Sequence, residues 1–162
     1  IIPPLVVADN TARKLSDQKI EEEAKVVAKE KEIPVSEAVK EIILETEEKP
    51  YEILLEESPG APFYRPEPYG GQTRLWINTA HRFYTNVYNM FGTGSTRAKA
   101  AIDLLLFTLA EKELAATEDR ERFYQSERGQ WSSHLENRLA QLEGLLPIED
   151  LNLDEDGNTQ NE

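Results

Sequence analysis

One short segment holds the residues whose types and spacing come closest to a catalytic or binding site: Asn78, His81, Tyr84 and Tyr88. The histidine and the two tyrosines are spaced i, i+3 and i+7, so a helix would place them on one face. A histidine can act as a general base or metal ligand when neighbouring groups orient it. The alternative is a helix start in which His81 hydrogen-bonds the backbone while the aromatic rings pack. Catalysis needs a second titrating partner, and the sequence assigns none, so no residue is designated catalytic.

Metal binding has little support in the sequence. The chain has two histidines, and His134 is 53 residues from His81, so no His-x-x-x-His spacing exists. It has no cysteine, which excludes disulfides, thiolate zinc sites and cysteine nucleophiles. We therefore expect no metal site.

A second candidate follows a glycine-containing loop at residues 92–94 and consists of Ser95, Thr96, Arg97 and Lys99. Free N–H groups at a helix N-terminus, together with two cations, are one arrangement that binds anions. The segment lacks the glycine and lysine spacing of a P-loop. The alternative is a glycine C-cap followed by a Ser or Thr N-cap, with both cations solvated or paired with carboxylates elsewhere.

Prolines and hydrophobic periodicity predict the elements that position these groups. Residues 1–15 contain adjacent prolines at positions 3 and 4 and are expected to form an extended arm. Apolar residues at helical spacing predict helices from about 16–31 and 36–48, the second capped by Ser36.

The middle of the chain is rich in proline. Five of the nine prolines lie between Pro50 and Pro68, which excludes a helix there and predicts turns. Residues 51–56 and 72–77 have the composition of strands. We expect these two strands to pair as an antiparallel hairpin.

Three more helices are expected, over residues 80–91, 96–116 and 118–146. The second of these is apolar nearly all round, so it should be the central buried helix. The acidic tail, 149–162, has too little apolar surface to fold and is predicted to be disordered. The predicted fold class is α+β and predominantly helical, with about five helices and a two-stranded antiparallel β-hairpin in one domain at residues 16–148.

The last predicted helix carries large apolar residues on or near one stripe: Tyr124, Trp131, Leu135, Leu139 and Leu142. Aromatic anchors of this kind dominate protein interfaces. The leucine seam is too short to identify a coiled coil. Packing within the chain and self-association both remain open interpretations of the stripe.

The net charge of the chain limits the kinds of partner that it can bind. The 162 residues carry a formal net charge of -13, concentrated in residues 1–70 and 148–162, while residues 71–147 are neutral. Such acidity repels phosphate backbones and anionic membranes, so nucleic-acid and membrane roles are not expected. No apolar run reaches the roughly 18 residues of a membrane span. The absence of cysteine suits a reducing cytoplasm, and a first residue that is not Met predicts a piece of a longer protein.

Residues 74–88 and 101–113 together resemble the C-terminal region of prokaryotic and phage ATP-binding proteins of the gyrase/histidine-kinase/MutL (GHKL) type. In that family a strand ending in Ile-Asn precedes a His-x-Phe-Tyr helix and then a leucine-rich helix ending in acidic residues. The matching residues here are Ile77-Asn78, His81-x-Phe83-Tyr84 and the run at 104–106. The position after the histidine differs, because this chain has Arg82 where the family has proline.

The resemblance implies a noncatalytic C-terminal assembly or coupling module. The family's ATP-binding asparagine helix, its Asp-x-Gly-x-Gly loop and its glycine-rich lid are missing, so no cofactor is expected in this chain. ATP and Mg²⁺ would belong to an upstream ATPase domain, and the partner would be that domain or a second copy. The alternative function is a small hydrolase or an anion- or ligand-binding domain organised on His81, Tyr84 and Arg97.

Overall fold

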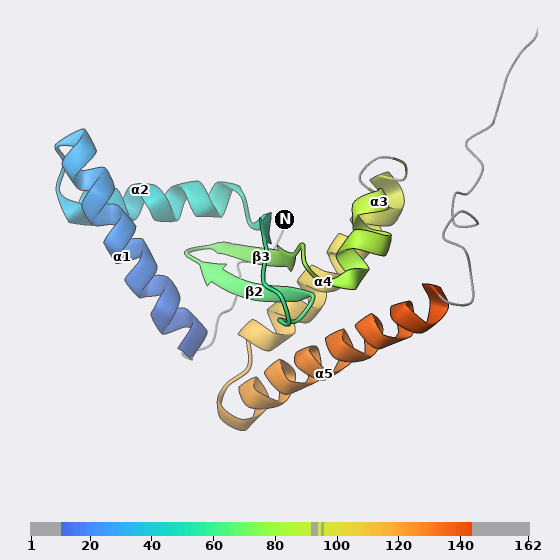
Figure 1. Ribbon diagram of the computed structural model, residues 1–162. Coiled ribbons are helices and arrows are strands. Elements are labelled where there is room, and N and C mark those ends of the chain that lie inside the picture. The colour runs from blue at the N-terminus through green and yellow to red at the C-terminus, as the bar shows by residue number, and fades with distance from the viewer. Residues whose placement is uncertain (1–10, 92–93, 95, 144–162) are drawn as a thin grey trace, which may run out of the picture.

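The computed structural model describes residues 11–91, 94 and 96–143 (Figure 1). Helices α1 and α2 come first and are followed by a sheet of three strands: α1 Thr11–Lys31, α2 Val35–Glu48, β1 Tyr51–Glu56, β2 Tyr64–Tyr69 and β3 Gln72–Asn78. Helical segments complete the described chain: the π-helix η1 Tyr84–Tyr88, then α3 Asn89–Phe91, α4 Thr96–Leu114 and α5 Glu118–Glu143. Within these ranges, no helix combines the length and apolar character needed to cross a bilayer.

The first two helices differ from expectation at their N-terminal ends. Helix α1 begins at Thr11, so residues 11–15, expected in the extended arm, are helical. Those five residues contain no proline and include Ala, Arg, Lys and Leu, which are strong helix formers. Helix α2 begins at Val35 with Pro34 as its N-cap and has no side-chain cap, although Ser36 was expected in that role. The Pro34 carbonyl accepts hydrogen bonds from the N–H groups of Glu37 at 3.0 Å and Ala38 at 3.1 Å.

Helices α1 and α2 pack together through small side chains. The cluster combines three residues of α1, two of α2 and one of β2: Ile20, Ala24, Ala28, Ala38, Ile42 and Tyr69. The residues of α1 recur every four positions, as expected for one helical face. Alanine at the contact lets the two helix backbones approach closely, and Tyr69 links the pair to the sheet.

The sheet corrects the predicted two-stranded antiparallel hairpin. It has three strands in the order β1-β3-β2. The two predicted strands do pair, with Ile53 opposite Leu75, but they run parallel. The antiparallel partner of β3 is β2, with Tyr64 opposite Ile77. The hairpin therefore joins β2 to β3, and β3 lies between the other two strands.

The prolines of β2 explain why the sequence pointed to turns here. The Asn78 N–H donates to the Phe63 carbonyl at 2.8 Å, so in this register odd-numbered residues of β2 face β3 with their backbone hydrogen-bonding groups. Pro66 and Pro68 alternate with these residues and turn their nitrogen atoms to the outer edge. Proline therefore costs no ladder hydrogen bond, because it sits on an edge strand with its nitrogen outward.

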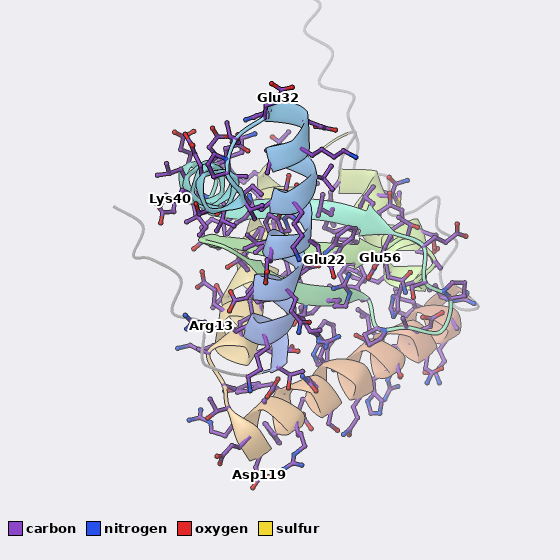
Figure 2. All side chains as sticks on the ribbon, turned by 90° about the vertical axis from the view of Figure 1, so that its left-hand side faces the viewer. Arg13, Glu22, Glu32, Lys40, Glu56 and Asp119 are labelled. Carbon is purple, nitrogen blue, oxygen red and sulfur yellow. The ribbon has the colours of Figure 1, made fainter. Side chains whose placement is uncertain are left out.

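The two faces of the sheet differ in character. One face packs its apolar side chains against α4, where Leu75 and Ile77 meet Leu106 and Ala110. The other face is polar and lies beside α1, which crosses the strands in Figure 2. Helices α1 and α2 therefore lie at one side of the sheet, and α3, α4 and α5 lie at the other (Figure 1).

Helix α4 is not the central buried helix that its composition predicted. Leu106 and Ala110 are buried, but Leu104 is 70% exposed and Leu105 is 59% exposed. A single sheet offers α4 one face to pack against, so only a narrow stripe of the helix is covered. Apolar side chains consequently remain on the surface of this helix.

Candidate functional site

A cavity of about 840 Å³ lies beside the segment that the sequence singled out. Its walls come from the loop at residues 60–62, the connection from β3 to η1, and α5. The titratable side chains in the lining are His81, His134 and Glu136. Because His81 is only 3% exposed, its hydrogen bonds determine what chemistry it can perform.

Both ring nitrogens of His81 are engaged within the chain. Nδ1 accepts a hydrogen bond from the Phe83 N–H at 3.1 Å. Nε2 lies 3.1 Å from the Ser132 carbonyl oxygen and 3.1 Å from a carboxylate oxygen of Glu136. This pattern fits the neutral tautomer with its proton on Nε2, because Nδ1 must keep a lone pair for Phe83. His81 therefore connects the start of the helical segment to α5 through hydrogen bonds. Neither ring nitrogen has a free lone pair with which to act as a general base.

Ser132 does not complete a nucleophilic pair with His81. Its hydroxyl oxygen accepts a hydrogen bond from the Phe63 N–H at 3.2 Å, and only its backbone carbonyl contacts the imidazole. A Ser–His nucleophile needs the hydroxyl within hydrogen-bond reach of the ring nitrogen. Ser132 instead connects α5 to the strand that begins after Phe63.

Asn78 holds the loop that forms one wall of the cavity. Its Oδ1 accepts hydrogen bonds from the N–H groups of Ser58 and Ala80, both at 3.0 Å. Its Nδ2 donates to the carbonyls of Ser58 at 2.7 Å, Ala61 at 3.1 Å and Pro62 at 3.3 Å. The amide has used its whole hydrogen-bonding capacity within the chain, so Asn78 is positioned to order the loop.

Tyr84 and Tyr88 pack against the core instead of lining the cavity. Their ring centroids are 6.0 Å apart. The Tyr88 hydroxyl donates to Asp103 at 2.6 Å, and Lys99 donates to the other carboxylate oxygen at 2.7 Å. Burial, followed by the hydrogen bond to Asp103, raises the pKa of Tyr88. Tyr88 and Lys99, which the sequence assigned to separate sites, therefore meet at Asp103.

The proposed anion-binding group is partly dispersed. Ser95 lies outside the described residues, and Thr96 and Arg97 are exposed at the start of α4. Lys99 pairs with Asp103 four residues later, and its Nζ lies 5.1 Å from the Tyr88 ring centroid. The carboxylate therefore neutralises one of the two cations on which the anion site depended.

The residues of the predicted interface stripe on α5 differ in exposure: four are half-buried and one is exposed. Trp131 packs within the chain, with its ring 5.6 Å from that of Tyr64. Leu135 and Leu139 are half-buried, while Leu142 is 46% exposed. Tyr124 is half-buried and lies against the ring of its neighbour Phe123. The aromatic anchor of the stripe is thus used inside the chain.

A largely buried ion pair between α4 and α5 has no signal in the sequence. Two guanidinium nitrogens of Arg128 donate to the two carboxylate oxygens of Glu113, at 2.9 and 3.0 Å. A third donates to the Tyr64 carbonyl at 3.1 Å. Burial, reinforced by Glu113 and opposed by Arg128, raises the pKa of the Tyr64 hydroxyl to about 12. The partners are distant in sequence, so no local spacing indicates the contact.

A second charged cluster occupies the polar face of the sheet. Glu67 accepts hydrogen bonds from Lys19 at 2.6 Å, from Arg65 at 3.2 Å and from the Trp76 indole. Arg65 also pairs with Glu56 at 3.1 Å. Burial acts to raise the pKa of Glu67, but the charge and hydrogen bonds of Lys19, with those of Trp76 and Arg65, outweigh it and lower the pKa. The cluster ties α1 to β2.

In the described part of the chain, no group of three or more metal-ligating side chains comes together. A scan of protein-family models, a search of curated proteins and a search of solved structures each found no match to this chain. The resemblance to GHKL-type ATPases therefore stays a prediction.

Proposed function

We propose that this chain is a noncatalytic assembly module, acting in the cytoplasm as the C-terminal coupling part of a GHKL-type ATPase and associating with a second copy of itself. The family assignment in this proposal comes from the resemblance at residues 74–88 and 101–113. The support for self-association comes from apolar side chains on the surface of the molecule. The family assignment and the self-association are tested by separate experiments.

The surface that carries the proposal is the β1/α4 patch, which consists of Tyr51, Leu55, Leu104 and Phe107. Tyr51 is 38%, Leu55 is 55% and Leu104 is 70% exposed. The Tyr51 and Phe107 ring centroids are 4.8 Å apart, which joins the strand to the helix. Leu104 lies one turn before Phe107, and Leu55 lies on the same sheet face as Tyr51. Grouped apolar side chains at a protein surface mark interaction sites.

The engagement of His81 supports a noncatalytic role. Its Nδ1 accepts a backbone N–H and its Nε2 lies within hydrogen-bond distance of a backbone carbonyl, so proton transfer would break a structural hydrogen bond. The alternative hydrolase, organised on His81, Tyr84 and Arg97, gains no support from the cavity. Neither Tyr84 nor Arg97 is among the residues that line it.

The test of self-association compares two leucines of similar exposure. Leu104 is on the patch, and Leu44, 60% exposed on α2, is away from it. We expect Leu104→Ser to raise the dimer dissociation constant at least about tenfold, the equivalent of roughly 1.4 kcal/mol. Leu44→Ser should leave it unchanged. Sedimentation equilibrium of both variants checks this, and equal effects would contradict the patch.

The coupling part of the proposal predicts no nucleotide site in this chain. Isothermal titration with ATP and Mg²⁺ should give no heat of binding at nucleotide concentrations up to about 1 mM. Micromolar binding would contradict the assignment of ATP to a separate domain.

A further inference from the structure

We propose that two copies of this chain associate through β1, whose outer edge pairs with the same edge of the second copy as antiparallel strands about a two-fold axis at Ile53. This inference rests on the proposed function and adds to it the surface, the partner and the register. Two features support it: which residues of β1 turn their backbone N–H and C=O groups outward, and which side chains would lie opposite each other in the paired strands.

The phase of β1 follows from its bonds to β3. The Thr73 N–H donates to the Pro50 carbonyl at 2.8 Å, and the Thr79 N–H donates to the Glu56 carbonyl at 2.8 Å. In a parallel pair, the residues that bond to one neighbour alternate with residues that face the opposite side. Even-numbered residues of β1 therefore turn their N–H and C=O groups to β3.

The odd-numbered residues of β1 face the outer edge of the sheet. These are Tyr51, Ile53 and Leu55, and of the described strands only β3 is paired with β1. A row of unpaired groups on an edge strand is a template for another strand. Their side chains lie on the α4 face, so pairing at this edge would extend the β1/α4 patch.

The opposite edge of the sheet cannot serve in the same way. On β2, Pro66 and Pro68 occupy outward positions and supply no N–H group. Proline on an edge strand is a common means of preventing strand addition. Of the two edges, β1 is therefore the one able to pair with another strand.

Antiparallel pairing about Ile53 uses every outward group of β1. Ile53 faces Ile53 of the second copy, and Tyr51 faces Leu55 of the second copy, as hydrogen-bonded pairs. All three residues then donate and accept across the axis. On the α4 face, the exposed Tyr51 and Leu55 become cross-strand neighbours, a favourable aromatic–aliphatic pair.

The charges on the other face favour the same register. Pairing about Ile53 places Glu52 opposite Leu54 of the second copy, so no carboxylate opposes another. Pairing about Leu54 would place Glu52 opposite Glu56, and like charges directly opposite are destabilising. Pairing about Glu52 would place Glu52 opposite Glu52 of the second copy, so of these registers the charges favour the one about Ile53.

Disulfide trapping tests the register because the wild-type chain has no cysteine. The variants are Tyr51→Cys and Leu55→Cys, alone and mixed. Opposed residues in a hydrogen-bonded antiparallel pair have Cα atoms about 5.5 Å apart, within the range of a disulfide. Identical residues would be four positions apart along the strands, roughly 13 Å. We expect the equimolar mixture to form covalent dimers on mild oxidation, and neither variant alone to do so.

A proline variant tests the backbone contact. Leu55→Pro removes an outward N–H and leaves the ladder with β3 intact, whereas Leu55→Ala removes the side chain and keeps the N–H. We expect Leu55→Pro to raise the dimer dissociation constant at least about tenfold above that of Leu55→Ala. Circular dichroism melting of every variant checks that the fold is retained.

The outcomes separate this inference from the proposed function. A wild-type dimer that resists Leu55→Pro and gives no cross-link in the mixture would place self-association on another surface and overturn the β1 pairing alone. A wild-type monomer at all concentrations would overturn both proposals. Cross-linking of Tyr51→Cys by itself would overturn the register. Amide protection of the β1 edge in a monomer, lost on deleting residues 1–10, would assign the edge to the chain's own N-terminal segment and overturn the inference.

Discussion

Asn78 and His81 are buried polar side chains whose hydrogen bonds connect the sheet, the loop at 58–62 and α5. Buried polar groups of this kind are costly to disrupt because removing one partner leaves the others unsatisfied in a site away from water. At the residue scale, the structure therefore assigns them a role in stability. Their sequence neighbourhood indicated the right residues, but the α5 partners of His81 lie 51 or more positions away and left no local signal.

Changing Asn78 to Asp should test this role with almost no change in shape. In the wild type, Nδ2 of Asn78 donates to three backbone carbonyls. Aspartate places an oxygen at that position, so its lone pairs face the carbonyl lone pairs and a negative charge is buried. We expect a loss of about 3 kcal/mol in the free energy of unfolding, measured by urea denaturation at pH 7. Asn137→Asp, at an exposed position on α5, is the matched control and should cost under about 0.5 kcal/mol. An equally stable Asn78→Asp protein would contradict the assignment.

Glu67 should make stability depend on pH in the acid range. Its pKa in the folded chain lies below the ordinary value of 4.5, since Lys19, Trp76 and Arg65 outweigh the effect of burial. A lowered carboxyl pKa stabilises the fold above the unfolded-state pKa, and this stabilisation is lost as pH falls through the folded-state pKa.

The matching variant is Glu67→Gln, which removes the charge at every pH. At pH 7 it should be less stable than the wild type by about 1–2 kcal/mol, and the difference should shrink below about pH 4. Urea denaturation across a pH series measures both curves. Glu48→Gln, at the exposed end of α2, should give a curve parallel to that of the wild type. A Glu67→Gln deficit that grows on acidification would contradict the sign.

At the scale of elements, α4 and α5 are joined by the Glu113–Arg128 pair and by apolar contacts around Trp131. The pair lies near the end of α4 and in the first half of α5, and Arg128 also binds the β2 backbone. It therefore fixes three elements at one point. Because the side chains of Arg128 and Glu113 are only 13% and 8% exposed, removing either partner leaves a charge that water compensates poorly.

A double-mutant cycle should expose this coupling. Arg128→Met or Glu113→Gln alone should lower the free energy of unfolding by about 3–5 kcal/mol, and the double variant should lose less than the sum. The control cycle uses Arg122 and Asp119, an ion pair whose side chains are 77% and 92% exposed. Its coupling should be under about 0.5 kcal/mol. Additive effects at positions 113 and 128 in thermal and urea unfolding would contradict the account.

Several elements were predictable because their signals are local. The periodicity of α2 and the composition of the segments at 51–56 and 72–77 identified a helix and two strands near their observed positions. The strand β2 was missed because Pro66 and Pro68 lower strand propensity. These prolines are tolerated because β2 is an edge strand and their nitrogen atoms point away from β3. Which positions point outward depends on the register with β3, and the β2 sequence alone does not give that register. The parallel direction of β1 likewise depends on the whole sheet.

At the scale of the molecule, one sheet separates two groups of helices (Figure 1). The Glu67 cluster covers the polar face beside α1, and the apolar face beside α4 continues to β1, an edge strand of the sheet that the described residues form. The burial of α4 could not be predicted from its own composition, because it depends on how much surface the sheet offers. The exposed leucines and the edge position of β1 among the described strands are the features on which the proposed self-association rests.

The most direct test of this account is the solution mass of the full 162-residue chain by light scattering after size exclusion, from about 1 μM to 1 mM. Self-association predicts a mass that rises from that of the 18.5 kDa chain to twice that value and then stays constant, because pairing about a two-fold axis is closed. A monomer at every concentration, or a mass that keeps rising beyond the dimer, would contradict it.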